Sequence, residues 1–448
     1  MQVQEDVRIG LFDKYTALID RLDPVRYVGV VKKCTASMII SEGPQASIGE
    51  LCEILSLRTG EKYLAEVIAF EDNEVKLFPY QSVSHIEKGS LVAALGRPLS
   101  IPASEELCGR VIDSLGRPID GKGPLRVARH ISVFNRRPHV LTRKPINERI
   151  LTGVKAVDFF TPLGKGQRIG LFAGSGVGKS TLMGMMAKDS SADVNVIALI
   201  GERGREVSEF INDTLGEEGM KRSVVVVSDS SDTPLSRFRG AYTATAIAEF
   251  FRDRGKDVML YFDSVTRLAM AIREIGLASG EVAASRGYTP NVFSSLQELL
   301  ERCATSDKGT ITGIYTVLVE GGDFDEPITD CVRAIIDGHI ILDRKLAERG
   351  QYPAIDVLAS LSRLENAVAS RFQRQAAAKI RSLISVYRER KDLIDVGAYS
   401  RGTDWLTDEA IDKIDGINRF LSQDVDESVS FESICREAAA LTGTEITA

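Results

Sequence analysis

The sequence has few of the residues from which disulfide frameworks and zinc centres are built. Its six cysteines are scattered along the chain without any Cys-x-x-Cys spacing, and its four histidines are not clustered. Structural zinc sites need such closely spaced pairs, and small secreted domains need a denser set of cysteines. We therefore expect reduced thiols and no zinc site.

Long apolar runs are also missing. No run reaches the roughly 18 residues that a membrane span requires. Residues 1–6 have neither the basic start nor the apolar stretch of a signal peptide. Together with the reduced thiols, these absences predict a cytoplasmic protein.

The chain has no excess of positive charge. Its 448 residues carry a net charge of −7, with 44% hydrophobic and 27% charged residues, and no low-complexity tract. This composition is globular, and the length suggests roughly three domains. An acidic chain binds nucleic acid only through a local basic surface, and no aromatic-plus-basic stripe is present, so we expect no nucleic-acid partner.

One glycine-rich stretch organises the rest of the chain. It follows an apolar run at 168–173, which predicts a buried strand, and it precedes a segment with helical composition. Its members are Gly174, Ser175, Gly176, Val177, Gly178, Lys179, Ser180 and Thr181. Three glycines let the backbone N–H groups point into one concavity, Lys179 adds a mobile cation, and the Ser180 hydroxyl is a Mg²⁺ ligand. The sequence therefore predicts a triphosphate cradle, although Ala173 stands where the usual pattern has glycine.

The segments before this loop have three different patterns. Residues 1–24 hold one amphipathic helical pattern, which suits either packing on its own domain or docking to a partner. Residues 25–95 hold short β-like runs between turn signals, at 27–31, 37–40, 50–54, 63–70, 74–78 and 91–95, which predict a small barrel. Residues 96–150 are rich in Gly and Pro. Their basic run at 135–145 is interpreted as a solvated linker rather than an anion site.

Alternation of strands and helices begins after residue 150. Expected strands lie at 168–173, 195–200, 223–228, 258–263, 313–319 and 339–342, and expected helices at 206–215, 237–253 and 293–302. Such near-continuously apolar strands predict a parallel sheet covered on both faces. Beyond residue 367 we expect helices at 372–389, 392–396, 406–421 and 431–441, with Trp405 in the core. The predicted divisions are a docking segment (1–24), a barrel (25–95), an ATPase domain (96–366) and a helical domain (367–448).

Two carboxylates follow predicted strands of this sheet. Asp263 ends the apolar run that begins at Val258, so it emerges beside the phosphate loop, where an acid holds Mg²⁺ or its water. The alternative is an aspartate that caps the next helix. Glu202 follows another strand and has the chemistry of a general base for the attacking water, although Gly-Glu-Arg also suits a solvated turn.

Several arginines lie near the predicted strand ends. They are Arg203, Arg205, Arg267 and Arg363. Arg363 closes the α/β region, where an arginine finger for a neighbouring subunit would fit. Without further information, a surface salt bridge is the simpler interpretation of Arg363.

The motifs together resemble a known family. The string NERILTGVKAVD at 147–158, the phosphate loop and GER at 201–203 are similar to the catalytic subunits of rotary-type hexameric ATPases. Within that superfamily, SRGYTP at 285–290, YTVLVEGGDFDEP at 315–327 and ERGQYPAID at 348–356 resemble the type III export ATPases. The flagellar export branch matches best, and the virulence secretion ATPases share nearly all these motifs. The resemblance spans roughly residues 25–440, and Ala173 is usual in the export branch.

The resemblance implies roles for individual residues. Glu202 would activate the water with Arg203 nearby, and Arg363 would be a finger donated in trans to the adjacent subunit's nucleotide. Arg267 would face the same site, and Tyr352 would stack on the adenine. Two departures, Val282-Ala283-Ala284 in place of a Pro-Pro and Glu365 after the finger region, leave the phosphate chemistry untouched.

The resemblance also implies an architecture, an activity and partners. The fold would be multidomain α/β: an N-terminal β-barrel, a central parallel-sheet P-loop (RecA-like) ATPase domain and a C-terminal helical domain. The activity would be Mg²⁺-dependent ATP hydrolysis that energises protein export, with ATP and Mg²⁺ bound at sites shared within a homohexameric ring. Implied partners are a stator-like regulatory subunit on the N-terminal segment, a stalk protein, export substrates and chaperones. The ring would lie in the cytoplasm, peripheral to a membrane-embedded export gate.

Three other functions are compatible with parts of the sequence. A non-catalytic subunit of a rotary ATPase usually lacks the water-activating acid, so Glu202 with Lys179 and Asp263 argues against it. An RNA-tracking hexameric helicase is disfavoured by the acidic net charge. A catalytic subunit of an ATP synthase remains open by fold, but the C-terminal region lacks the acidic loop expected to engage a rotor.

Overall fold

The computed structural model describes residues 15–16, 27–126, 129–135, 143–319 and 322–446. The chain forms two compact units, Met1–Pro98 and Leu99–Ala448. Within the predicted amphipathic segment at 1–24, only Tyr15 and Thr16 are described, and both are helical. The remainder of that predicted helix lies outside the described residues.

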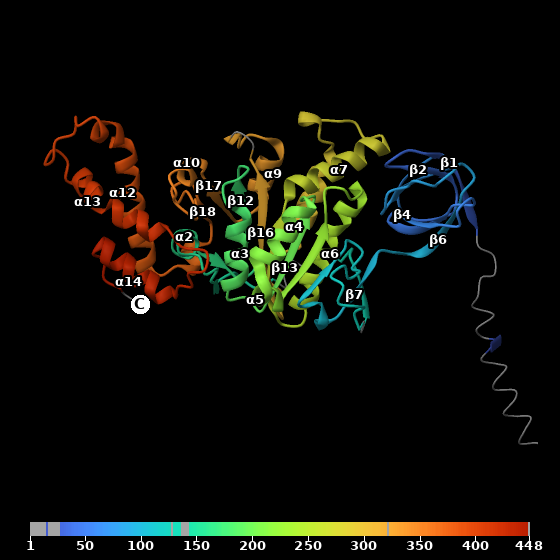
Figure 1. Cartoon of the computed structure of the whole chain (residues 1–448), viewed down its shortest axis with the longest axis horizontal. Coiled ribbons are helices and arrows are strands. Elements are labelled where there is room, and N and C mark those ends of the chain that lie inside the picture. The colour runs from blue at the N-terminus through green and yellow to red at the C-terminus, as the bar shows by residue number, and fades with distance from the viewer. Residues whose placement is uncertain (1–14, 17–26, 127–128, 136–142, 320–321, 447–448) are drawn as a thin grey trace, which may run out of the picture. The chain divides into compact units, whose positions relative to one another are not determined.

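The first unit contains a closed barrel of six strands, in the order β1-β2-β5-β4-β3-β6 (blue in Figure 1). Every neighbouring pair is antiparallel. The strands are β1 (Val28–Cys34), β2 (Ile39–Glu42), β3 (Glu50–Leu55), β4 (Lys62–Glu71), β5 (Glu74–Pro79) and β6 (Leu91–Pro98). Alternate residues such as Ile39, Ile54 and Leu77 are fully buried and fill the barrel. The predicted small barrel is confirmed.

An eight-stranded sheet forms the centre of the second unit. Its strand order is β18-β17-β12-β16-β15-β13-β14-β8, parallel throughout except for β18 at one edge. The strands are β8 (Arg110–Ile112), β12 (Arg168–Ala173), β13 (Val194–Ile200), β14 (Ser223–Ser228), β15 (Asp257–Asp263), β16 (Thr310–Leu318), β17 (Gly338–Leu342) and β18 (Leu361–Ser362). Every residue of β13 and β14 is buried, so both faces are covered, as the apolar runs predicted.

Helices between the strands cover this sheet, as Figure 1 shows for α3, α4, α6, α7 and α9. The helices are α2 (Lys155–Phe160), α3 (Lys179–Asp189), α4 (Gly204–Glu209), α5 (Gly216–Lys221), α6 (Pro234–Arg252), α7 (Val265–Ser279), α8 (Pro290–Leu300), α9 (Pro327–Ile335), α10 (Arg344–Glu348), α11 (Glu365–Val368), α12 (Arg371–Asp395), α13 (Trp405–Leu421) and α14 (Phe431–Thr442). Short elements complete the unit: β7 (Ser100–Ala103), β9 (Arg129–Ser132), β10 (Arg149–Ile150), β11 (Leu163–Gly164) and the 3-10 turns Glu105–Leu107 and Ser285–Gly287.

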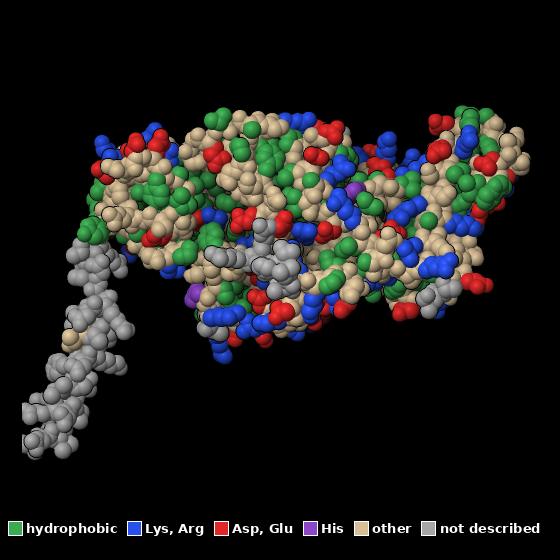
Figure 2. Space-filling view, turned by 180° about the vertical axis from the view of Figure 1, so that it is seen from behind, with side chains coloured by type: hydrophobic (Ala, Val, Ile, Leu, Met, Phe, Trp, Pro, Cys, Tyr) green, Lys and Arg blue, Asp and Glu red, His purple; other side chains and the backbone are tan. Residues whose placement is uncertain are grey.

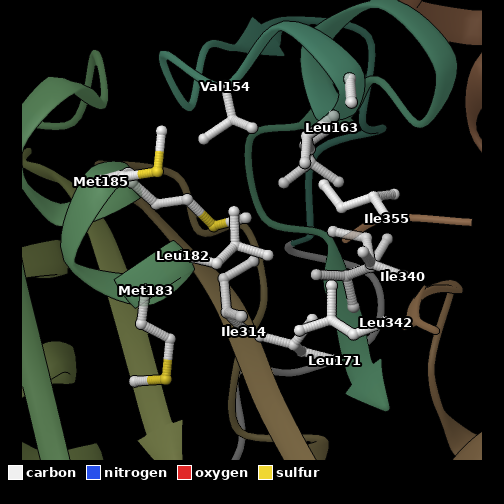
Figure 3. Close-up of a cluster of buried hydrophobic side chains, with 14 of the residues drawn as sticks. Val154, Leu163, Leu171, Leu182, Met183, Met185, Ile314, Ile340, Leu342 and Ile355 are labelled. Atoms are coloured by element: carbon white, nitrogen blue, oxygen red, sulfur yellow. The ribbon is translucent and has the colours of Figure 1, made fainter. Parts of the chain in front are cut away.

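The helix after the glycine-rich loop is held against the sheet by apolar side chains. Figure 3 shows Leu182 and Met185 of α3 on the side of the helix that faces Leu171 and Ile314 of two neighbouring strands. Leu182 is 1% exposed and Leu171 is fully buried. Burying such side chains contributes about 1.5–3 kcal/mol each. This packing fixes where the first turn of α3 points.

The C-terminal helices pack on the same hydrophobic core. Phe420 of α13 meets Phe159 of α2 edge to face, with ring centroids 5.5 Å apart. Gln373 of α12 is buried, and its amide donates to the carbonyl oxygens of Asp158 and Phe159. Burial raises the pKa of Asp158 to about 6, opposed by its hydrogen bonds from Thr152 and Gly153. Both α12 and α13 therefore contact α2, which precedes β12 in the chain. No helix among the described residues is long and apolar enough to span a membrane.

The stretch at 96–150 is more than a connection. β8 forms the sheet edge parallel to β14, and β7 pairs with β9. The two ends of the basic run contact the folded unit: Asn135 donates to Glu249 at 2.9 Å, and the exposed Lys144 donates to the Asp307 carbonyl at 2.9 Å. Residues 136–142 of the run lie outside the described part of the chain, so the interpretation of the run as a solvated linker stays a prediction.

A buried ion pair fastens this stretch to α6 and to the segment that follows α8. Arg302 and Glu249 are each 1% exposed, with Nη2 and Oε2 2.7 Å apart. Arg302 also donates from Nη1 to the Val133 carbonyl at 2.9 Å. Both charges are compensated, as burial demands.

Three helical predictions were wrong in detail. The helices expected at 372–389 and 392–396 form one helix, α12, because no Gly or Pro interrupts them. The helix expected at 206–215 is divided into α4 and a π-helical turn at Phe210–Leu215. Trp405 is 73% exposed rather than in the core. It precedes the buried stripe of α13 that begins at Thr407 and Ala410, so it lies off the packed face.

Candidate functional site

The glycine-rich loop connects the carboxyl end of β12 to the first turn of α3. Gly176 and Gly178 have φ angles of 77° and 91°, a region that glycine enters without steric cost. Gly178 is the N-cap of α3 and supplies no side-chain acceptor. The first N–H groups of this helix are therefore directed toward the loop, where an anion is the natural partner. The side chains of Ser180 and Thr181 are exposed beside it.

Charged groups from three strand ends meet beside this loop. Lys179 Nζ lies 2.5 Å from Asp263 Oδ1 and 3.8 Å from Glu202 Oε1. Asp263 ends β15, Glu202 follows β13, and these strands are neighbours in the sheet. Because parallel strands end at the same edge, residues distant in sequence converge there. The structure thus brings together Lys179, Asp263 and Glu202.

The Asp263 carboxylate has a second hydrogen-bond donor. Thr316, fully buried near the end of β16, donates from Oγ1 to Asp263 Oδ1 at 2.7 Å. The same oxygen also accepts a hydrogen bond from the Lys179 ammonium. Two donors therefore fix the orientation of the Asp263 carboxylate.

Glu202 has the environment of a general base. Its Oε1 is buried and has no hydrogen-bond partner among the described residues. Burial raises the pKa of Glu202, the Asp263 charge raises it further, and Lys179 and Arg267 oppose these effects. A carboxylate with a raised pKa and a free oxygen is suited to accept a proton.

The nearby arginines differ in their placement. Arg267 of α7 lies against the end of β13, since a Cβ built on Gly201 would meet its Cβ at 2.8 Å. Its Nε is buried and unpartnered among the described residues. Arg203 is exposed and pairs with Glu206 at 2.9 Å, and Arg205 pairs with Glu209. The Arg267 charge is close enough to Glu202 to lower its pKa, whereas Arg203 pairs with Glu206 at the surface.

A pocket of about 290 Å³ lies beside the loop. Tyr352 lines it, and the ring is 3.8 Å from a Cβ built on Gly178. Other lining residues are mostly apolar: Val177, Leu182, Met185, Leu342, Pro353 and Val425. The Tyr352 carbonyl accepts a hydrogen bond from the backbone N–H of Gln423 at 2.9 Å. A flat apolar group such as a nucleobase suits these walls.

Arg363 lies away from this site in the same chain. Arg363 follows β18, and its backbone N–H donates to the Asp337 carbonyl. Asp337 lies beside the start of β12, where its carboxylate pairs with Arg168. The loop is at the other end of β12, five residues or about 17 Å along the strand. Arg363 therefore does not reach the loop of its own chain.

The residues present fit a magnesium nucleotide. Among the described residues, no group of three or more His, Cys, Asp or Glu side chains is arranged to hold a metal. Mg²⁺ does not need such a cage, because it keeps waters and phosphate oxygens as ligands. The Ser180 hydroxyl and Asp263 would hold it. When bound, Mg²⁺ neutralises charge on the phosphates.

Sequence reasoning missed three contributors. Thr316 carries no motif of its own, but its position near the end of the strand beside β15 was a usable signal. Arg344 donates from Nη2 to the Ser175 carbonyl at 3.0 Å and so touches the loop from α10. Gln423 reaches the pocket beside the loop only through tertiary packing of the C-terminal region, so no pattern in the local sequence indicated it.

Replacing Thr316 with valine should impair the centre while leaving the fold intact. Losing a hydrogen bond to a charged group costs about 1.5–3 kcal/mol, so we expect kcat to fall roughly 10- to 100-fold. The Mg²⁺ concentration that half-saturates nucleotide binding should also rise. Thr316→Ser keeps the donor and should restore both values. Equal Mg²⁺ dependence in valine and serine variants would reduce Thr316 to a packing residue.

Comparison with known proteins identifies the class. Residues 153–362 match the model of the ATP synthase alpha/beta family, nucleotide-binding domain, and residues 369–439 match the T3SS EscN ATPase C-terminal domain. The chain is therefore a P-loop ATPase of the ATP synthase alpha/beta type.

Individual relatives indicate which branch of these ATPases the chain resembles. The chain is 49% identical over 436 residues to the flagellum-specific ATP synthase of Treponema pallidum, covering 97% of this chain and 98% of the relative. It is 46% identical over 408 residues to the type 3 secretion system ATPase of Xanthomonas euvesicatoria, covering 91% and 92%. The assembled ATPase EscN from enteropathogenic E. coli, solved in complex with its central stalk EscO, is 41% identical with a TM-score of 0.85, covering 92% of this chain and all of EscN.

The chain belongs to the family of flagellar and type III secretion ATPases. Its fold is the one expected: a β-barrel, a parallel-sheet nucleotide-binding region and C-terminal helices. The predicted family and ATPase activity are confirmed by these relatives.

Proposed function

We propose that this chain hydrolyses MgATP at the centre formed by Lys179, Asp263 and Glu202, and that hydrolysis drives protein export through a flagellar type III apparatus. The observation that carries the chemistry is the convergence of these side chains beside an uncapped helix start. The phosphate-binding cation, the Mg²⁺ ligand and the base that phosphoryl transfer needs each have a candidate within this group.

The residues in and around the loop have different roles in nucleotide binding and hydrolysis. The backbone N–H groups of 174–181 and the Lys179 ammonium bind the phosphates. Ser180 and Asp263 hold Mg²⁺, and Tyr352 stacks on the adenine in the adjoining pocket. Glu202 orients the attacking water and accepts its proton, and Arg203 and Arg267 complete the surrounding charge.

The active assembly that we propose is a homohexameric ring with sites shared between subunits. The distance of Arg363 from its own loop supports a role toward a neighbouring subunit. The relative EscN is described as an assembled ATPase with a central stalk. By analogy, the partners of this chain are a stalk protein in the ring, a stator-like subunit, export substrates and chaperones. The ring would lie in the cytoplasm at the inner face of the membrane, beside the export gate.

The flagellar assignment is supported by coverage rather than by chemistry. Three flagellar relatives match 95–97% of the chain at 49% identity, and three type 3 secretion system relatives match 89–92% at 44–48%; two further flagellar relatives match 90–93% at 41–45%. A strain lacking the encoding gene should fail to secrete hook and filament proteins and should not swim. Normal swimming combined with loss of needle-complex secretion would assign the protein to virulence export instead.

Deleting residues 1–20 tests the proposed docking segment. We expect the truncated protein to lose binding to the stator-like partner while its basal ATP hydrolysis changes less than twofold. Pull-down and phosphate release measure the two properties separately. Unchanged partner binding would instead support the alternative that this segment packs on its own domain.

A further inference from the structure

A second pocket lies between α10, α12 and α13, apart from the phosphate loop. Its volume is about 450 Å³. The floor is apolar and includes Ile355, Ile384 and Leu421, which are at most 5% exposed. A space of this size and polarity accommodates a small molecule rather than a few waters.

All charged residues that line this pocket are cationic. They are Arg349, Arg388, Lys391 and Arg419. Arg388 is neutralised by Asp356 at 3.0 Å, and Lys391 lies 3.7 Å from Asp395. Arg349 and Arg419 form no ion pair with any carboxylate in the described part of the chain. In a chain of net charge −7, this cationic lining is local. On the face of the molecule seen in Figure 2, Lys and Arg side chains also gather beside the C-terminal helices.

The pocket shares its wall with the pocket at Tyr352. Gln351 lines the first and Tyr352 the second, in adjacent positions of one loop. Ser422 and Gln423 are divided in the same way in a second loop. The backbone N–H of Gln423 joins the two loops by donating to the Tyr352 carbonyl. A ligand in one pocket therefore contacts the backbone that shapes the other.

We propose that this second pocket is an effector site for a soluble small molecule with a ring-sized apolar body and at least one anionic group. The apolar body contacts the buried floor, and the anion pairs with Arg349 and Arg419 at the rim. Occupancy changes nucleotide affinity through the shared wall, and the coupling is reciprocal. This coupling rests on the proposed nucleotide site, whereas ligand binding itself does not.

Fluorescence titration with 8-anilinonaphthalene-1-sulfonate tests binding, because this dye combines an aromatic body with one anion. Saturating MgADP keeps the dye out of the nucleotide pocket. We expect the double variant Arg349→Glu/Arg419→Glu to weaken dye binding at least tenfold. Arg390→Glu is the matched control on α12, since Arg390 is exposed and does not line the pocket. Asn418→Trp, which fills the pocket from its rim without altering charge, should also abolish binding.

Calorimetric titration of MgADP with and without saturating dye tests the coupling. We expect the ADP dissociation constant to differ at least threefold in the wild type and to be unaffected by dye in the double variant. Equal dye affinity in wild type, double variant and Asn418→Trp would overturn the site. Equal ADP affinity with and without bound dye would overturn the coupling. Absence of ADP binding to the wild type, with normal dye binding, would instead contradict the proposed function.

Discussion

Glu202→Gln is expected to bind MgATP with nearly wild-type affinity and to hydrolyse it about 10²- to 10⁴-fold more slowly, the usual contribution of a general base. Glutamine keeps the size of the side chain but cannot accept the proton of the attacking water. Fluorescent-nucleotide binding and single-turnover phosphate release measure the two effects independently. A variant that hydrolyses ATP at the wild-type rate would remove Glu202 as the base.

The pH dependence gives this prediction a second measurement. Glu202 must be deprotonated to act as base, and burial followed by the Asp263 charge raises its pKa. The wild-type rate should therefore increase with pH through a pKa above that of a free glutamate. Glu202→Gln should lack this acidic limb in its residual activity. Glu209→Gln is the matched control, because Glu209 pairs with Arg205 at the surface of α4, so the rise in rate with pH should persist in this variant.

Arg363→Ala should lower ATP hydrolysis by about 10³- to 10⁵-fold, the effect of losing an arginine finger. The decisive experiment mixes Arg363→Ala subunits with Lys179→Ala subunits, neither of which is active alone. If each site takes its loop from one subunit and its arginine from the next, an equal mixture leaves about a quarter of the interfaces intact. Activity of the mixture should therefore far exceed that of either parent.

Two results would contradict the shared site. One is a mixture that never exceeds its more active parent at any ratio, although assembly of the subunits is verified by light scattering. The other is an Arg363→Ala protein with normal hydrolysis. Arg436→Ala, an exposed substitution on α14, serves as control and should mix with Lys179→Ala without any gain beyond dilution.

The sequence was most informative where one short segment determines one element. Apolar runs located β12, β13, β14 and β15 to within a residue, because strands buried on both faces need such runs. Asp263 and Glu202 could be placed beside the loop because parallel strands end at a common edge.

The remaining features depend on contacts that no local pattern reveals. β8 is only three residues long and is a strand because β14 lies beside it. Thr316 gains its role from an aspartate 53 positions earlier. Trp405 was assigned to the core on residue type alone, whereas the stripe of α13 determines its burial. The pocket at Tyr352 closes only when the chain returns at Gln423.

The buried pair of Arg302 and Glu249 restricts how this sequence can evolve. Removing either partner leaves an uncompensated charge in the interior, which costs about 3–5 kcal/mol out of a net stability of about 5–15 kcal/mol. Replacing both by apolar residues of similar volume is nearly neutral or favourable. Each single substitution therefore gives a destabilised protein, whereas the original pair and the double apolar replacement are both stable. We expect these two positions to change together or not at all among homologues, and we expect Asn135, whose side chain donates to Glu249, to change with them.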